Sequence, residues 1–296
     1  MSDLITSETL SLNAAEALPR RGFVLGSLAA GFAASVAPNG ALLAQTITTD
    51  AAGLDVGTVA IGAGADKIPA YFAKPAGKTG LATVLVVQEI FGVHEHIRDL
   101  CRRLAKQGYL AVATELYVRQ GDPSKYTSIP TLIKEVVAKV PDAQVMADLD
   151  ATAAWAASHG GDAARLAITG FCWGGRVVWM YAAHNPAVKA GVAWYGRLTS
   201  ATSPNTPRHP YDVAGALNAP VLGLYGGADK GIPQDTIDEM KRRLAAGNAN
   251  AKASRFVVYP DAPHAFNADY RPSYRKEAAA DGWRRMLDWF ASHGMA

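Results

Sequence analysis

The sequence is poor in cysteine and in charge of either sign. Two cysteines occur in 296 residues, and 19% of the residues are charged. Two thiols allow at most one disulfide, which excludes a disulfide framework for a chain of this size and also a four-thiolate zinc site. The formal net charge is +3, and the basic residues are scattered along the chain. The sequence therefore lacks the basic patch of a nucleic-acid-binding protein.

Repeats and low-complexity segments are lacking as well. The 28 glycines and 16 prolines show neither a collagen-like period nor a linker-like bias. The hydrophobic fraction of 49% is too high for a disordered chain and sufficient for a sizeable core. Composition indicates a soluble globular enzyme or binding protein, with one large α/β domain or two small ones.

The first 44 residues differ from the rest and resemble an export signal. Arg20-Arg21 precedes a weakly apolar run from Phe23 to Ala37 that is rich in glycine and alanine. Paired arginines before such a run are typical of a twin-arginine signal, and the run is too short to span a bilayer stably. We expect a signal peptide over residues 1–44 and one catalytic domain over residues 45–296. The alternative is a cytoplasmic extension with a chance arginine pair.

This signal predicts where the protein works. A twin-arginine substrate folds in the cytoplasm, engages the export machinery and ends in the periplasm or outside the cell. We therefore expect a periplasmic or secreted protein without stable membrane insertion.

Apolar runs typical of buried strands alternate with helical patterns from about Thr48 onward. Strands separated by helices imply parallel crossovers, so we predict an α/β fold with a mostly parallel central sheet and helices on both faces. Its first two strands are expected to form an antiparallel pair. The expected strands are 56–61, 70–73, 83–87, 110–114, 165–169, 188–194, 221–225 and 255–259. The expected helices are 97–107, 131–139, 143–158, 177–183, 232–246 and 274–291.

A glycine-rich motif, Gly170-Phe171-Cys172-Trp173-Gly174-Gly175, joins one of these strands to a helix. It matches the G-x-S-x-G nucleophile elbow with cysteine in the place of serine. Its glycines permit a strained turn that runs close to neighbouring backbone. A helix N-terminus favours a thiolate, and the Trp173 N–H points where an oxyanion would form. The alternative is an inert buried cysteine in a tight turn.

Two later strands end in an acid and a histidine. Asp229 follows the strand 221–225, and His264 follows the strand 255–259. Nucleophile, acid and histidine in this chain order are typical of the α/β-hydrolase triad, and strand carboxyl ends are where such sheets place their sites. The alternatives are a helix N-cap for the acid and an ordinary loop residue for the histidine.

Beyond the leader, the chain resembles the dienelactone hydrolase (carboxymethylenebutenolidase) family. The matching stretches are 86–92, 116–120, the Cys172 elbow, 226–229 and 263–266. The resemblance implies an α/β-hydrolase fold and hydrolysis of a lactone or small carboxylic ester. We expect no cofactor and no metal.

The same resemblance implies a role for each site residue. Cys172 is the nucleophile, His264 the base and Asp229 the acid that orients it. Glu89 interacts with the resting thiol and helps govern its ionisation. The reaction passes through a thioester that water hydrolyses.

The resemblance also implies the backbone donors, and further residues are candidates for substrate contacts. The Ile90 N–H completes the oxyanion hole with the Trp173 N–H. Arg119, Phe91 and Tyr195 are candidates for contacting the substrate. Arg119 has the alternative of a structural pair with Glu115 or Asp122.

The sequence departs from the family where the founding enzymes hold a substrate carboxylate with arginines and a tyrosine. Asn267 and Ala268 stand where an arginine is expected shortly after the histidine, and residues 127–142 offer only Lys134 and Lys139. A lysine is a point charge and does not reproduce the bidentate fork of an arginine. Esters or lactones in general are therefore predicted more firmly than dienelactone itself.

Three further interpretations are weaker. His94-Glu95-His96 lacks the second histidine of the H-E-x-x-H zinc motif and is explained as the polar start of a helix. A thiol-redox or sensor protein and a non-catalytic binding protein of this fold are the alternative functions. The complete triad argues against both, because redox sensing needs no Asp–His pair and binding needs no nucleophile.

Overall fold

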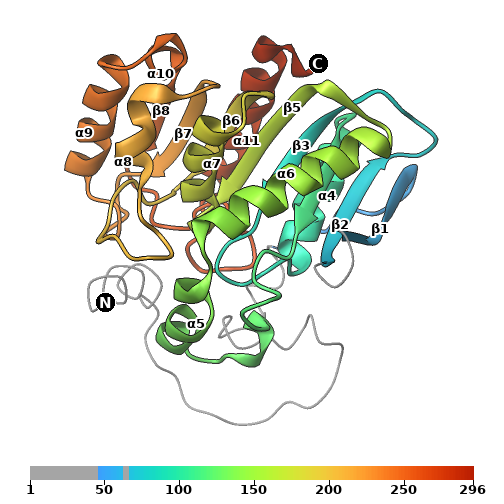
Figure 1. Ribbon diagram of the computed structural model, residues 1–296, viewed down its shortest axis with the longest axis horizontal. Coiled ribbons are helices and arrows are strands. Elements are labelled where there is room, and N and C mark those ends of the chain that lie inside the picture. The colour runs from blue at the N-terminus through green and yellow to red at the C-terminus, as the bar shows by residue number, and fades with distance from the viewer. Residues whose placement is uncertain (1–45, 63–66) are drawn as a thin grey trace.

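The computed structural model describes residues 46–62 and 67–296, and its centre is an eight-stranded sheet (Figure 1). The predicted leader, residues 1–44, lies outside this part of the chain. The strand order is β1-β2-β4-β3-β5-β6-β7-β8. β1 pairs antiparallel with β2 and β2 with β4, whereas all other neighbours are parallel. The predicted mostly parallel α/β architecture with an antiparallel opening pair is confirmed. The strands are β1 Leu54–Ile61, β2 Ile68–Pro75, β3 Leu81–Val87, β4 Leu110–Thr114, β5 Gly161–Phe171, β6 Val188–Trp194, β7 Val221–Gly226 and β8 Arg255–Tyr259.

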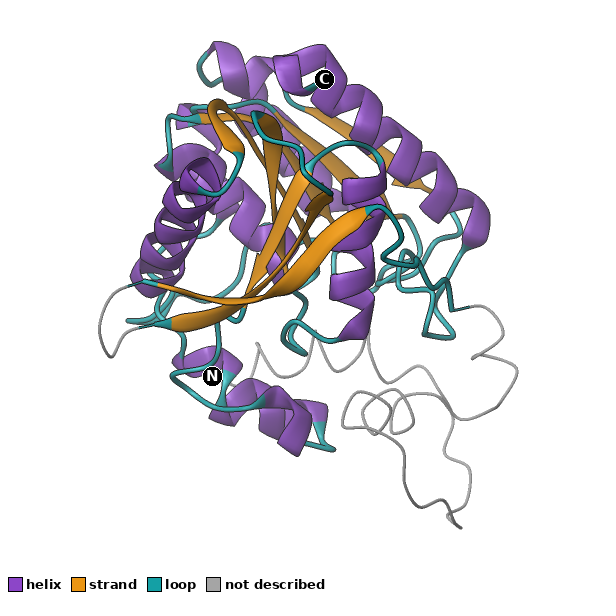
Figure 2. Cartoon of the chain, turned by 90° about the vertical axis from the view of Figure 1, so that its right-hand side faces the viewer, coloured by secondary structure: helices purple, strands orange, loops and turns teal. Residues whose placement is uncertain are grey.

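Helices cover both faces of the sheet, which explains the continuous apolar runs of its inner strands. α6 and α7 lie over one face, and α4 and α11 over the other (Figure 1). Every residue of β4 and of β7 is buried as a result. Figure 2 shows the twisted sheet between these two layers. The helices are α4 Glu95–Lys106, α5 Ile129–Glu135, α6 Asp142–Ser158, α7 Trp173–His184, α8 Pro210–Val213, α9 Gln234–Ala245, α10 Ala249–Ala253 and α11 Lys276–Phe290.

The predicted helix 131–139 is the expectation that the structure changes most. α5 begins earlier, because Ser128 caps it and Pro130 occupies its first turn. It ends at Glu135, and a 3₁₀ turn follows over Val137–Lys139. Two adjacent β-branched residues, Val136 and Val137, disfavour a continuous helix at this point. The short helices α8 and α10 were not predicted, since four or five residues carry no readable period.

The parallel strands deliver their loops to one edge of the sheet. Cys172 directly follows β5, Tyr195 directly follows β6, and Glu89 lies two residues beyond β3. Asp229 and His264 follow β7 and β8. Five strand ends thus bring together residues separated by up to 175 positions in the sequence (264 − 89). Within the described residues, no helix has both the length and the apolar character needed to cross a membrane.

Candidate active site

The turn between β5 and α7 holds Cys172 in a conformation that side chains rarely adopt. Its φ is 56°, in the left-handed region, and its side chain is 3% exposed. The Cys172 N–H donates to the Trp194 carbonyl at 3.0 Å, which fixes the turn against β6. A Cβ at Gly174 would lie 2.5 Å from the Gln88 carbonyl oxygen, so this position needs glycine. The thiol therefore sits at the N-terminus of α7, as an elbow requires.

His264 and Asp229 form a buried hydrogen-bonded pair. His264 Nδ1 lies 2.7 Å from Asp229 Oδ2, and the two residues are 6% and 4% exposed. The other carboxylate oxygen, Oδ1, accepts from the Gly231 N–H at 2.8 Å. Both oxygens of Asp229 are thus engaged, and the imidazole is held through Nδ1 with Nε2 on its far side.

The electrostatics of this pair favour a proton on His264. Burial on its own lowers the pKa of His264, but the charges of Asp229 and then Cys172 raise it well above its usual value. Burial on its own raises the pKa of Asp229, but the His264 charge and hydrogen bond lower it below its usual value. A protonated imidazole between a carboxylate and a sulfur is the arrangement that these charges stabilise.

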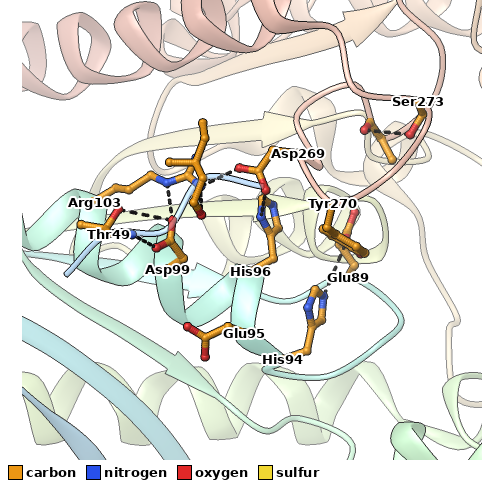
Figure 3. A network of polar contacts seen from close by, with 12 residues as sticks. Thr49, Glu89, His94, Glu95, His96, Asp99, Arg103, Asp269, Tyr270 and Ser273 are labelled. Carbon is orange, nitrogen blue, oxygen red and sulfur yellow. Dashed lines mark hydrogen bonds and ion pairs between the residues drawn. The ribbon is translucent and has the colours of Figure 1, made fainter. Parts of the chain in front are cut away.

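Glu89 is a second buried carboxylate at the strand ends. It is 1% exposed, and its Oε2 accepts from the Tyr270 hydroxyl at 2.8 Å and lies 3.7 Å from His94 Nε2 (Figure 3). Burial on its own raises the pKa of Glu89, but His94 and the charge of Arg271 lower it to about 2. Burial lowers the pKa of His94 itself. At neutral pH the pair is therefore an ionised glutamate beside a neutral imidazole.

Backbone strain is concentrated around these side chains. Apart from Cys172, Tyr195 has φ 39° and Ala265 has φ 57°, and these are the non-glycine residues with positive φ in the described ranges. Tyr195 follows β6, and Ala265 follows the histidine. Such conformations cost energy and persist where the surrounding structure enforces them, typically at functional sites.

The predicted substrate contacts lie in different environments. The Tyr195 ring packs edge-on against His264, with centroids 5.1 Å apart. In the part of the chain that the structure describes, the buried Tyr195 hydroxyl makes no hydrogen bond. Phe91 is 5% exposed, and the Arg271 guanidinium lies over its ring, 5.4 Å from the ring centroid. Arg119 pairs with Asp148 of α6 at 2.8 and 3.0 Å, and contact between this arginine and a substrate stays a prediction.

The backbone donors predicted for an oxyanion hole lie at two of these strand ends. Trp173 is the first residue of α7, where an N–H has no intrahelical acceptor. Ile90 directly follows Glu89 and is fully buried.

Two residues at the site, Tyr270 and Arg271, were missed by the sequence reasoning. They are 7% and 5% exposed, and both act on Glu89, one by hydrogen bonding and the other by charge. Arg271 lies seven positions after His264, farther along the chain than the positions searched for an arginine. The available signal was three consecutive polar residues in a segment without helical or strand periodicity.

The remaining predicted features lie apart from this cluster. Lys134 and Lys139 are exposed and pair with Glu135. Cys101 is fully buried in α4, and both cysteines are free thiols. Burial raises the pKa of Cys101 far above its usual value, so this thiol is not a nucleophile at neutral pH.

Comparison with known proteins matches this architecture to one family. The model of the dienelactone hydrolase family matches residues 68–294. A protein of Methylorubrum extorquens named "Putative carboxymethylenebutenolidase" is 61% identical over 287 residues, which is 97% of each chain. A protein of the same name from Salmonella typhimurium is 58% identical over 89% of this chain and 96% of its own. The crystal structure of a "Putative Dienelactone Hydrolase" from Klebsiella pneumoniae has 63% identity and a TM-score of 0.78, covering 80% of this chain and 98% of that one.

Proposed function

The chain belongs to the dienelactone hydrolase family and is a lactone or ester hydrolase, and we propose that it cleaves its substrate through Cys172, His264 and Asp229. The observation that carries this proposal is the 2.7 Å hydrogen bond between His264 Nδ1 and Asp229 Oδ2 beside a strained cysteine at a helix N-terminus. Each of the three residues follows a different strand, so the sheet itself sets their spacing. Small carboxylic esters and lactones are the substrate class.

The first half of the reaction forms a thioester. The Cys172 thiol gives its proton to His264 Nε2, and the resulting thiolate attacks the substrate carbonyl carbon. The N–H groups of Ile90 and Trp173 stabilise the oxyanion. When the tetrahedral intermediate collapses, the C–O bond breaks, and the imidazolium returns its proton to the leaving alkoxide. Asp229 holds the imidazole through Nδ1 and favours its protonated form.

The second half releases the acid. Water gives a proton to His264 Nε2 while its oxygen attacks the thioester carbonyl. The C–S bond then breaks, and Cys172 leaves as a thiolate that regains its proton from the imidazolium. With a lactone, the leaving alkoxide stays attached to the acyl group. The raised pKa of His264 supports its place as the acceptor of both protons.

Trapping the acylated protein tests this proposal directly. Rapid acid quench of the full chain during turnover of p-nitrophenyl acetate is expected to leave one acetyl group on the peptide that contains Cys172. Prior treatment with iodoacetamide is expected to modify Cys172 but not the fully buried Cys101, and to prevent acetylation. Mass spectrometry of the digested protein measures both. Acetylation at another residue, or turnover by the alkylated protein, would show that the nucleophile is not Cys172.

We also propose that residues 1–44 direct export by the twin-arginine route. The Arg20-Arg21 pair before an apolar run supports this proposal. In a bacterial host with this route, residues 1–44 are expected to carry a fused folded reporter into the periplasm. A Lys-Lys pair at positions 20 and 21 is expected to retain most of the reporter in the cytoplasm. Cell fractionation measures this, and a native fusion that stays cytoplasmic would refute the proposal.

A further inference from the structure

Three consecutive buried residues after the histidine, Asp269, Tyr270 and Arg271, join two loops of the active site. They are 0%, 7% and 5% exposed. Each contacts the stretch that runs from the end of β3 into α4. Tyr270 bonds Glu89, Arg271 lies over Phe91, and Asp269 pairs with side chains of α4. The loop that carries His264 is thereby fixed to the loop that carries Glu89.

The Tyr270 side chain is placed as a dedicated donor to Glu89. Its hydroxyl donates to Glu89 Oε2 at 2.8 Å, and its ring packs against two imidazoles, with its centroid 5.1 Å from those of His94 and of His96 (Figure 3). Burial, and then the Glu89 charge, raise the pKa of Tyr270 well above its usual value. The hydroxyl therefore stays protonated at neutral pH and donates its proton to the ionised Glu89 carboxylate, which can only accept.

A charged network anchors the backbone on the N-terminal side of Tyr270. Asp269 accepts from Arg103 at 2.6 Å and lies 3.3 Å from His96 Nδ1. Arg103 donates at 2.5 Å to Asp99, which also accepts from the Thr49 N–H (Figure 3). A buried carboxylate with several charged partners is costly to move. Tyr270 is therefore held at a fixed position relative to α4 and the end of β3.

Glu89 and Cys172 follow the ends of two neighbouring parallel strands, β3 and β5. Val87 of β3 pairs with Gly170 of β5, and each of the two side chains lies two residues beyond this pair. Cys172 also acts electrostatically on Tyr270. Tyr270 donates to Glu89 Oε2, whereas Oε1 makes no hydrogen bond within the described residues.

We propose that Tyr270 is a positioning residue that orients the Glu89 carboxylate through Oε2 and withdraws part of its negative charge, so that Oε1 faces the thiol without suppressing the thiolate. This inference rests on the proposed function, in which Cys172 is the nucleophile. The hydroxyl sets how strongly Glu89 opposes thiolate formation, since a neighbouring like charge disfavours an anion. The titratable and charged groups around Glu89 come from four strand ends: His94, His96, Cys172, Tyr195, His264, Tyr270 and Arg271.

The test measures the alkylation rate of Cys172 by iodoacetamide as a function of pH. In Tyr270→Phe, the Glu89 charge is no longer shared with a hydrogen-bond donor. The midpoint of the pH dependence of alkylation is therefore expected to rise by about 0.5 to 1 pH unit. In Glu89→Gln it is expected to fall. Tyr270→Phe made on top of Glu89→Gln is expected to move it no further, because the hydroxyl acts through the carboxylate. With p-nitrophenyl acetate, Tyr270→Phe is expected to lower kcat about 5- to 10-fold and to leave KM within about twofold.

Tyr259→Phe is the matched control. It removes a tyrosine hydroxyl that also donates to a carboxylate, that of Asp281 in α11, at 2.9 Å. It is expected to change neither the midpoint nor kcat. An unchanged midpoint in Tyr270→Phe, or an equal shift in the Glu89→Gln background, would overturn the inference. Full hydrolysis by protein alkylated at Cys172 would instead refute the proposed function, so the two failures are distinguishable.

Discussion

Replacing Cys172 by alanine is expected to lower kcat/KM for p-nitrophenyl esters by about four orders of magnitude. The thiolate is the atom that bonds to the substrate carbonyl, and no rearrangement of His264 or Asp229 supplies a substitute. The remaining groups at the site still orient the ester and stabilise an oxyanion, which accounts for any residual rate. Steady-state kinetics measures the loss, and circular dichroism shows whether the fold is retained.

The fold of this variant is expected to survive because the change is small. Alanine keeps the Cβ that the turn accommodates at φ 56°, and only the sulfur is lost from a site that is 3% exposed. Cys101→Ala is the matched control, since the other thiol is fully buried in α4. It is expected to lose about 1 kcal/mol of stability to the small cavity and to keep kcat/KM within about twofold. Comparable activity in Cys172→Ala and the wild type would refute thiol catalysis.

The two alternative functions fit the geometry less well than hydrolysis does. A redox sensor needs an accessible, low-pKa thiol, often beside a resolving cysteine, but here the second thiol, Cys101, lies buried in α4. A binding protein gains nothing from a buried Asp–His pair, because burying a carboxylate and an imidazole is costly. That cost is accounted for when the imidazole must be held through Nδ1 to move protons at Nε2.

The sequence was sufficient to predict which of these side chains follow the carboxyl ends of strands. Cys172, Asp229 and His264 each follow an apolar run, and parallel strands bring their carboxyl ends to one edge regardless of how far apart they are in the chain. The tight turn at Cys172 was predictable from the glycines around it. A close backbone approach excludes side chains, and this constraint appears in the sequence itself.

Tyr270 and Arg271 were not predictable in the same way. They lie in a loop that has no period, and Tyr270 bonds a residue 181 positions away in the sequence. Their positions depend on the contacts of Asp269 with Arg103 and His96, and these contacts form only in the folded structure. His94 and His96 were interpreted correctly as the start of α4. Their packing against Tyr270 was not predictable, because it depends on the same long-range contacts of the loop.

Replacing Gly196 by alanine is expected to lower the free energy of unfolding by about 3 to 5 kcal/mol. Gly196 lies just beyond β6, and an added Cβ there would be 2.7 Å from the Gly175 Cα in the first turn of α7. The contact is reciprocal, because a Cβ at Gly175 would lie 2.8 Å from the Gly196 Cα. Two backbones meet here, so no side chain can rotate away to relieve the overlap. Urea denaturation followed by circular dichroism measures the loss.

The same substitution is expected to reduce activity in whatever fraction still folds. Separating α7 from β6 strains the Cys172 N–H to Trp194 carbonyl bond of 3.0 Å and moves the elbow relative to Tyr195 and His264. Gly215→Ala is the matched control, since a Cβ there would lie 3.9 Å from the Gly247 Cα, an ordinary contact. It is expected to leave stability within about 0.5 kcal/mol. Equal stability of the Gly196 and Gly215 variants would mean that the α7–β6 contact is not what holds the elbow in place.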